Sequence, residues 1–373
     1  MSDKIKLIFF HPYSYLGGAD NSLRRLIENL DNKYFSITFL SLNNSYLRKI
    51  LSKKATFITL KANRTFHTIP ELKNIIQKYE ESLKFKKIIL ISNQNFANII
   101  ASFAISNNSN IKTIFIDRNH LDELGFYKSF SDKIKKNLIK ILIKFRYSKA
   151  DKVIGICKKL SDDLSQFIGK KVQTIYSPGY NKEILNLAKK KIHLNKNFKY
   201  IINVSRFTKR KDHLTTLKAF KIASQKLNRL RLILIGYGPE YKNIVKEAKK
   251  LNVKHKLIIL NNVKNPYPYI KKSELLLLSS KYEGMGNILV EALTLKIPII
   301  STNCNAGPSE ILLNGKGGDL VKVGDFTNMA KKIIFHFKNK KILKKKTNLA
   351  RKKLKRFDIN CHVKLYKKIF DKI

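Results

Sequence analysis

The chain has 373 residues, of which 43% are hydrophobic, so it is long enough for two domain cores and apolar enough to build both. Its 76 Lys and Arg against 26 Asp and Glu give a formal charge of +50, which attracts polyanions and anionic membranes, although lysine-rich codon usage can also contribute. No apolar run of about 18 residues is present, which excludes a membrane-spanning helix, and three scattered cysteines without metal-ligand spacing predict reduced thiols of a cytosolic protein.

The chain begins with a predicted strand, Lys4 to Phe10, which is too short for the apolar core of a signal peptide. A loop containing Gly17 and Gly18 follows, and apolar residues then recur at helical spacing. A strand, a glycine loop and a helix together allow close approach of a phosphate. A glycine pair by itself, however, most often only turns the chain.

Strand-like segments recur at 36–40, 57–60, 87–92 and 112–116, separated by segments with helical features. This alternation predicts a parallel sheet flanked by helices. The last of these strands leads into Asp117-Arg-Asn-His120. Judged from the residues alone, a single histidine such as His120 is more often structural than catalytic.

The segment from Ser131 to Lys149 predicts an amphipathic helix. Its polar side carries many lysines, opposed only by Asp132. Its apolar stripe consists of Ile134, Leu138, Ile141, Leu142 and Phe145. Such a helix can lie in a membrane interface, or it can be an ordinary surface helix whose stripe faces the domain core. Both interpretations remain open at the level of the sequence.

A break in regular structure separates the two halves of the chain. A further strand near 151–157, a helix from Ser161 and a strand at 173–176 lead to Ser177-Pro-Gly-Tyr-Asn181, where Pro and Gly mark a domain boundary. We therefore predict a first domain over 1–180, a polar linker over 181–199, a second domain over 200–356, and a terminal helix over 357–373.

Basic side chains follow the first predicted strand of the second half. Arg206 and Lys211 lie on the loop after the strand at 200–206, where both can reach one diphosphate. In so basic a chain, any loop holds Arg and Lys, so the pair alone proves little. Strands at 231–235 and 256–260 follow, the first ending in a Gly-Tyr-Gly-Pro turn and the second leading to Val263.

The most informative stretch follows the short apolar strand Leu275–Leu278. Glu283-Gly-Met-Gly-Asn-Ile-Leu-Val-Glu291 holds two glutamates about two helical turns apart, with a glycine turn and the start of a helix between them. The turn offers free N–H groups to an anion, and each carboxylate can hold sugar hydroxyls. From spacing alone, two solvated glutamates are about as probable as a site.

This stretch resembles the E-x7-E motif of the Leloir-type retaining glycosyltransferases of family 4, especially those that build bacterial surface polysaccharides and lipopolysaccharides. The segment from Pro298 to Glu310 and the Arg206, Lys211 pair are similar to the same family. The resemblance covers most of the second half of the chain. It implies an α/β fold of GT-B type, two Rossmann-like parallel-sheet domains facing across a cleft, with the last helix crossing back to the first domain.

The resemblance also implies roles for particular residues. A sugar would pass from a nucleoside diphosphate sugar, with a UDP-linked sugar as the first choice and GDP-mannose as the second, to a glycan acceptor. Catalytic roles would fall to His120, Arg206, Lys211 and Glu283, with Glu291 on the ribose. The donor would be held by Gly17, Gly18, Arg206, Lys211, Val263, Glu283, Gly284, Met285, Gly286, Asn287 and Glu291. Neither a metal nor a cofactor is expected, because Arg and Lys take the place of a cation.

The acceptor is expected to be lipid-linked or a polysaccharide, and the charge suits peripheral association with the inner face of the cytoplasmic membrane. Two other classes remain open. A basic nucleic-acid-binding protein would explain the charge, although no recognition motif is present and no specific nucleic acid is expected. A catalytically inactive GT-B scaffold in a glycan assembly complex would keep the fold. Within the GT-B enzymes themselves, a nucleotide-sugar epimerase would share the architecture without using an acceptor.

Overall fold

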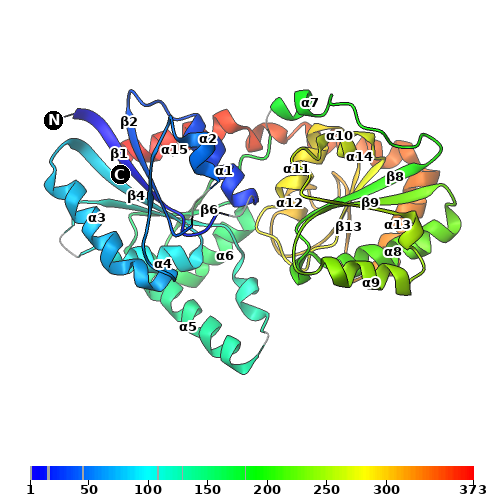
Figure 1. Ribbon diagram of the computed structural model, residues 1–373, viewed down its shortest axis with the longest axis horizontal. Helices are drawn as coiled ribbons and strands as arrows, with labels where there is room; N and C mark the ends of the chain where they lie inside the picture. The colour runs from blue at the N-terminus through cyan, green and yellow to red at the C-terminus, as the bar shows by residue number, and fades with distance from the viewer. Residues whose placement is uncertain (1, 15–16, 44–45, 107–108, 128, 181) are drawn as a thin grey trace. The chain divides into compact units, whose positions relative to one another are not determined.

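The computed structural model describes residues 2–14, 17–43, 46–106, 109–127, 129–180 and 182–373. The chain folds into two compact units (Figure 1). Unit 1 contains the chain up to Pro178 together with Ile359–Ile373, and unit 2 is Gly179–Asp358. Within the described residues, no helix combines the length and apolarity that crossing a membrane requires.

Unit 1 is built on a 7-stranded sheet in the order β3-β2-β1-β4-β5-β6-β7. The strands are β1 Ser2–Phe10, β2 Phe35–Ser41, β3 Thr56–Thr59, β4 Phe85–Asn93, β5 Lys112–Asp117, β6 Lys152–Gly155 and β7 Val172–Thr174. The helices are α1 Gly18–Glu28, α2 Leu47–Leu51, α3 Ile69–Glu81, α4 Asn95–Ala104, α5 Phe130–Arg146, α6 Lys158–Ile168 and α15 Ile359–Lys372. The strand order reverses between β1 and β4, where open α/β sheets bind ligands.

The strands of unit 1 pair in parallel, as their apolar sequences predict. In β1, Leu7, Ile8 and Phe10 are completely buried, because helices cover both faces of the sheet (Figure 1). Helix α6 begins at Lys158, earlier than the expected start at Ser161. Ser161 instead lies within the first turn, where its hydroxyl donates to the Cys157 carbonyl at 3.0 Å.

Unit 2 is built on a 6-stranded parallel sheet in the order β10-β9-β8-β11-β12-β13. The strands are β8 Lys199–Val204, β9 Leu230–Gly236, β10 Leu257–Asn261, β11 Leu275–Leu278, β12 Ile299–Thr302 and β13 Asp319–Val321. The helices are α7 Glu183–Leu187, α8 His213–Lys226, α9 Tyr241–Lys250, α10 Tyr267–Lys272, α11 Asn287–Thr294, α12 Pro308–Ile311, α13 Phe326–Lys338 and α14 Lys340–Arg351. Here the order reverses between β8 and β11, so the carboxyl ends of these two neighbouring strands form the switch point.

The structure contradicts the expected linker over 181–199. Its described residues belong to unit 2, and they include α7, which packs against α10 and α11. The chain passes between units at Pro178 and Gly179 instead. It returns at Ile359, and α15 packs against α1 in unit 1, where Lys87 Nζ donates to the Phe370 carbonyl at 3.1 Å. Polar composition suggested a free linker, but the apolar Ile184 of α7 is buried.

Helix α5 contradicts the interpretation in which its apolar stripe faces the core. Ile143 is the buried apolar residue of the helix, whereas Ile134, Leu138, Ile141 and Phe145 are each more than half exposed. The helix therefore packs on unit 1 through a different face from the one that its sequence stripe suggested.

Candidate functional site

Arg206, Lys211 and Glu283 all lie at the switch point of unit 2. Arg206 and Lys211 follow β8, and Glu283 follows β11, which pairs with β8 in the sheet. Because the carboxyl ends of parallel strands meet at one edge, the two loops lie beside each other. Main-chain contact joins them, since Lys281 N–H donates to the Arg210 carbonyl at 2.8 Å.

The centre of this site is an ion pair between Lys211 Nζ and Glu283 Oε1. The two side chains are only 12% and 7% exposed. The Ser280 hydroxyl donates to the same Glu283 oxygen at 2.6 Å. Arg206, by contrast, is exposed at the surface of the unit. The site therefore combines a shielded, paired lysine with an arginine that is open to a ligand.

The charges around Glu283 keep it ionised. Burial by itself raises the pKa of its carboxyl, but the positive charges of Lys211 and Arg210 and the hydrogen bonds from Lys211 and Ser280 outweigh burial, so the pKa lies below its usual value. Burial lowers the pKa of Lys211, and Arg210 and Arg206 add to this effect while Glu283 opposes it. A bound anion would relieve the crowding of positive charge that Lys211 experiences.

Hydrogen bonds hold the loop after β8 in place. The Ser279 hydroxyl donates to the Lys211 carbonyl at 2.9 Å, and Thr216 Oγ1 donates to Ser279 Oγ at 2.8 Å. On the opposite side, the Gly-Tyr-Gly-Pro turn after β9 packs on the same loop. A Cβ on Gly236 would lie 2.0 Å from the Ser205 carbonyl oxygen, so only glycine fits there. The turn predicted after this strand thus supports the arginine loop.

The segment between the two glutamates forms the expected turn and helix. Gly286 caps α11 with a φ of 78°, in the left-handed region that favours glycine. Gly307 packs so closely that an added Cβ would lie 2.0 Å from the Met285 carbonyl oxygen. Glu291 lies in α11 and is half-buried, and Asn287 begins that helix. Gly284 and Met285 are buried within the turn.

Val263 lies just beyond β10, the edge strand of this sheet, and is half-buried. Because β10 is separated from β8 by β9, Val263 stands two strands away from the ion pair along the same edge of the sheet. The structure thus brings the candidates of the second half to one sheet edge. The positive charge of Arg210 lowers the pKa of both Lys211 and Glu283. The sequence analysis did not single out Arg210, because it is one cation in a run of three.

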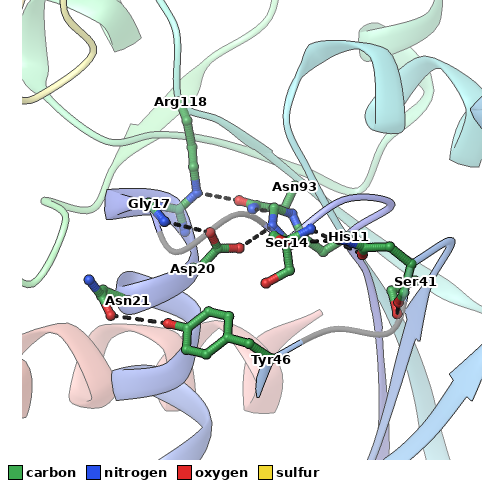
Figure 2. A network of polar contacts seen from close by, with 10 residues as sticks. His11, Ser14, Gly17, Asp20, Asn21, Ser41, Tyr46, Asn93 and Arg118 are labelled. Atoms are coloured by element: carbon green, nitrogen blue, oxygen red, sulfur yellow. Dashed lines mark hydrogen bonds and ion pairs between the residues drawn. The ribbon is translucent and has the colours of Figure 1, made fainter. Parts of the chain in front are cut away.

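The switch point of unit 1 holds a second, buried polar network (Figure 2). His11 Nε2 lies 2.8 Å from Asp20 Oδ1, and His11 Nδ1 lies 3.0 Å from Asn93 Nδ2. Arg118 Nε–H donates to Asn93 Oδ1, which turns the Asn93 amide group toward His11. The pattern assigns the proton of His11 to Nε2, because Nδ1 accepts from Asn93. Gly17 N–H donates to Asp20 Oδ2 at 2.8 Å.

Asp20 and Arg118 supply the carboxylate and the guanidinium of this network. Burial raises the pKa of Asp20, but the hydrogen bonds from His11 and from the Gly17 N–H outweigh burial, so the pKa lies below the usual value. Gly17 and Gly18 start α1 above this network, and Gly18 is exposed. Tyr15 and Leu16, which complete the predicted glycine loop, lie outside the described residues.

His120 lies apart from this network, after β5. Its Nδ1 accepts from the Asp122 N–H at 3.3 Å, and its Nε2 lies 2.6 Å from Asp163 Oδ2. Both ring nitrogens are therefore engaged within unit 1, and the ring is buried. The catalytic role of His120 stays a prediction. The sequence did not single out His11, Asn93 and Arg118, and position at strand ends was the signal that could have found them.

Among the residues that the structure describes, no group of three or more His, Cys, Asp and Glu is arranged to hold a metal ion. Cys304, near Glu283, is buried, and burial together with the charge of Glu283 raises the pKa of its thiol to about 12. A buried thiol with a raised pKa is typical of a structural cysteine.

Comparison with known proteins agrees with the resemblance drawn from the motifs. Residues 186–355, nearly all of unit 2, match the family model described as Glycosyl transferases group 1. The chain is 29% identical over 233 residues to a Campylobacter jejuni enzyme named N-acetylgalactosamine-N,N'-diacetylbacillosaminyl-diphospho-undecaprenol 4-alpha-N-acetylgalactosaminyltransferase, covering 62% of this chain and 61% of the relative. It is 23% identical over 309 residues to the amylovoran biosynthesis glycosyltransferase AmsD of Erwinia amylovora, covering 82% and 83%.

Alignments with the Campylobacter enzyme and two other curated relatives span only 54% to 61% of the lengths of those proteins. Among solved structures, Anabaena Alr3699/HepE in complex with UDP-glucose superposes with a TM-score of 0.80, covering 99% of this chain and 100% of that one at 15% identity. At this identity the likeness concerns the fold alone. The predicted GT-B architecture of two Rossmann-like parallel-sheet domains is thereby confirmed.

Proposed function

We propose that this chain, whose residues 186–355 carry the group 1 glycosyltransferase domain, transfers a sugar from a nucleoside diphosphate sugar to a glycan acceptor. The observation that carries this proposal is the shielded Lys211–Glu283 pair, with Arg206 exposed on the same loop. Cations and a carboxylate held together at a switch point suit a ligand that joins a pyrophosphate to a sugar.

Arg206 and Lys211 act on the leaving group. When the bond between the sugar and the diphosphate breaks, negative charge grows on the departing phosphate oxygen. A guanidinium and an ammonium already fixed by the loop after β8 stabilise this charge without having to reorganise. Lys211 exchanges part of its contact with Glu283 for the diphosphate, which frees a carboxylate oxygen for the sugar hydroxyls.

The donor lies along the carboxyl edge of the unit 2 sheet. Glu283 holds the sugar, Glu291 the ribose, and the main chain near Val263 the base, while the turn from Gly284 to Asn287 presents N–H groups to the phosphates. A UDP-linked hexose or N-acetylhexosamine is our first choice, supported by the UDP-glucose complex of the Anabaena relative. GDP-mannose is the second.

Transfer proceeds with retention at the anomeric carbon and without a metal. The resemblance to family 4 supports retention, with the leaving phosphate accepting the proton of the acceptor hydroxyl. The positive charge of Arg206 and Lys211 takes the place of a divalent cation. Full turnover in the presence of a chelator, with an α-configured product by NMR, is the expected result.

The acceptor is a lipid-linked or polysaccharide glycan, and acceptor recognition is assigned to unit 1, with His120 and with Gly17 and Gly18, which the family resemblance puts beside both the donor diphosphate and the acceptor. The diphospho-undecaprenol substrate in the name of the Campylobacter relative supports a lipid-linked acceptor. An acceptor of this kind keeps its lipid in a bilayer, so the protein works at the inner face of the cytoplasmic membrane as a peripheral protein.

Donor binding and turnover test the proposal. Thermal shift against UDP, GDP and ADP sugars should single out one nucleotide, and release of the nucleoside diphosphate should fall at least 100-fold in Lys211→Ala and Glu283→Gln. Lys226→Ala, at the far end of α8, removes the same charge and should leave turnover unchanged. Near-normal turnover in both site variants contradicts the assignment.

The same measurements separate the rival classes. A nucleic-acid-binding protein would bind DNA with strong salt dependence and show no shift with any nucleotide sugar. An inactive scaffold would bind the donor but release no nucleoside diphosphate with any acceptor. The buried ion pair favours a nucleotide-sugar site over a nucleic-acid surface, because nucleic acids bind exposed cations whereas burying two charges is costly.

A further inference from the structure

Helix α5 of unit 1 has two apolar faces, and only one of them packs against the protein. Ile139, Leu142 and Ile143 point toward the unit and are half-buried or buried. Phe130, Ile134 and Phe145 are 75%, 57% and 65% exposed, and Leu138 and Ile141 are exposed to a similar degree. In Figure 1 the helix forms the outer edge of unit 1. Neighbouring apolar side chains exposed together on one helix face are typical of an interaction surface.

The exposed residues form one stripe. At about 100° per residue, positions 130, 134, 138, 141 and 145 fall within about 80° of the helix circumference. The buried Ile143 lies on the opposite side of the helix. The periodicity that predicted an amphipathic helix therefore describes the outward face, while a few residues on the back of the helix anchor it to unit 1.

Lysines border this stripe on both sides. Lys133, Lys140 and Lys144 lie on one side at about 100° from the centre of the stripe, and Lys135 lies at about the same angle on the other. Their long side chains can extend past the apolar surface toward an anionic layer above it. The one acidic residue of the helix, Asp132, is already neutralised by Lys136 at 3.2 Å.

Aromatic side chains extend the surface beyond the helix. Phe126 and Tyr127, just before α5, are 46% and 42% exposed. Phe103 on α4 is also exposed, and the Arg146 guanidinium lies 4.0 Å from the centre of its ring. Aromatic rings beside basic groups are typical of proteins that rest at the level of lipid headgroups.

We propose that the outward face of α5, defined by Phe130, Ile134, Leu138, Ile141 and Phe145, inserts into the headgroup region of an anionic lipid bilayer with the helix parallel to the membrane plane. Charge complementarity selects this occupant. In a pair of identical chains, the bordering lysines would face one another and repel, and a nucleic acid would leave the apolar stripe in water.

This inference names the element that would hold the enzyme at the membrane of its lipid-linked acceptor, and in that respect it rests on the proposed function. The two ideas fail independently. Vesicle binding is measured without a nucleotide sugar, and donor binding is measured without vesicles.

The first test is sedimentation of the full chain with vesicles of phosphatidylglycerol and phosphatidylcholine. Ile134→Gln, Leu138→Gln and Ile141→Gln together should lower the partition coefficient at least tenfold. Lys133→Gln, Lys140→Gln and Lys144→Gln together should lower it by about fivefold per lysine on anionic vesicles and leave the weak binding to pure phosphatidylcholine unchanged.

Helix α14 of unit 2 provides a matched control. Ile342 and Leu349 are exposed to a similar degree on a helix that is also rich in lysine. Lys341→Gln, Lys344→Gln and Lys345→Gln remove the same three charges, and Ile342→Gln with Leu349→Gln remove comparable apolar surface. Neither control should lower binding more than about twofold, because a diffuse attraction to the net charge falls little when three of many lysines are lost.

A second test locates the contact. The chain contains no tryptophan, so Leu138→Trp creates a single fluorophore on the proposed face, and Leu349→Trp creates one on the control helix. Emission of the first should shift to the blue and be quenched by brominated lipid, while emission of the second should not change.

Four results would overturn the inference: no binding to anionic vesicles, an equal loss in the α14 controls, an unquenched fluorophore at position 138, or a dimer in solution that the apolar triple variant converts to a monomer. Circular dichroism of each variant confirms that a loss of binding is not a loss of fold.

Discussion

Replacing Lys211 with methionine isolates the ion pair at the heart of the unit 2 site. The variant keeps the length of the side chain and removes its charge, which leaves the carboxylate of Glu283, whose side chain is 7% exposed, without its direct partner. Ser280 still donates to Glu283 Oε1 at 2.6 Å, so the carboxylate is not wholly unsatisfied. Stability and turnover should both fall, for separable reasons.

The stability loss has a natural upper limit. Removing one partner of a buried pair costs about 3–5 kcal/mol. Glu283 can escape by taking up a proton, and at pH 7 neutralising a carboxyl of ordinary pKa costs about 3.7 kcal/mol. Because the hydroxyl of Ser280 still donates to the carboxylate, the expected loss of stability is somewhat smaller, about 3 kcal/mol. For a unit of this size, that corresponds to about 6–12 °C in the melting temperature.

The loss should depend on pH in a definite direction. In the natural chain the pKa of Glu283 is depressed, so its contribution to stability is present above the pKa of the unfolded carboxyl and is lost as the pH falls through the lower folded value. In Lys211→Met the folded pKa should be raised, so the unfavourable charge disappears in acid. The deficit in melting temperature should therefore be large at pH 8 and shrink toward pH 4.5.

Calorimetry of the single variants and of Lys211→Met with Glu283→Gln provides the assay. The double variant removes both charges, so it should recover most of the stability while turnover remains at least 100-fold reduced. A single variant as stable as the natural chain at pH 8, or a deficit that grows in acid, would refute the reasoning. Recovery of turnover in the double variant would show that the pair serves only the fold.

Three further outcomes are expected. Gly307→Ala should lower stability by about 1–3 kcal/mol, because the new Cβ would lie 2.0 Å from the Met285 carbonyl oxygen. The same variant should weaken donor binding measured by calorimetry, and an unchanged affinity would show that the turn is not part of the site. Asp20→Asn should destabilise unit 1 at pH 7 but less so as the pH falls below about 4, since the pKa of this carboxyl is depressed below that of the unfolded chain, and denaturant titration at pH 7 and about pH 3 checks this. Iodoacetamide at pH 8 should label Cys361 in the native protein but label Cys304 only in denaturant, which mass spectrometry of the digested chain detects.

Most of the sheet structure was predictable, because parallel strands covered by helices read as short apolar runs between polar loops. The strand Leu275–Leu278 was predicted at its observed bounds. The glycine turn after it was also predicted, because a left-handed backbone conformation such as that of Gly286 favours glycine, and glycine can be recognised in the sequence. The linker prediction over 181–199 was wrong, because polar composition says little about whether a few apolar residues anchor a segment.

The site residues also divide into those that belong to a local motif and those that only the fold brings together. Lys211 and Glu283 were named because each belongs to a local motif of the family that the sequence resembles, and their roles stay predictions. Their contact across 72 residues of chain was visible only in the fold. His11, Asn93 and Arg118 come from three separate strand ends, and no local pattern relates them. Their hydrogen bonds exist only because the order of strands in the sheet makes β1, β4 and β5 neighbours.

The sequence by itself determined the elements, the pattern of their faces and the motif residues. Helical periodicity, strand periodicity and glycine turns all depend on residues only a few positions apart in the chain. Only the tertiary structure decided which apolar face of α5 is buried, which histidine joins a charged network, and where the chain leaves unit 1. These outcomes depend on which distant surfaces meet, and a face that is apolar in sequence can be covered by protein or left for another partner.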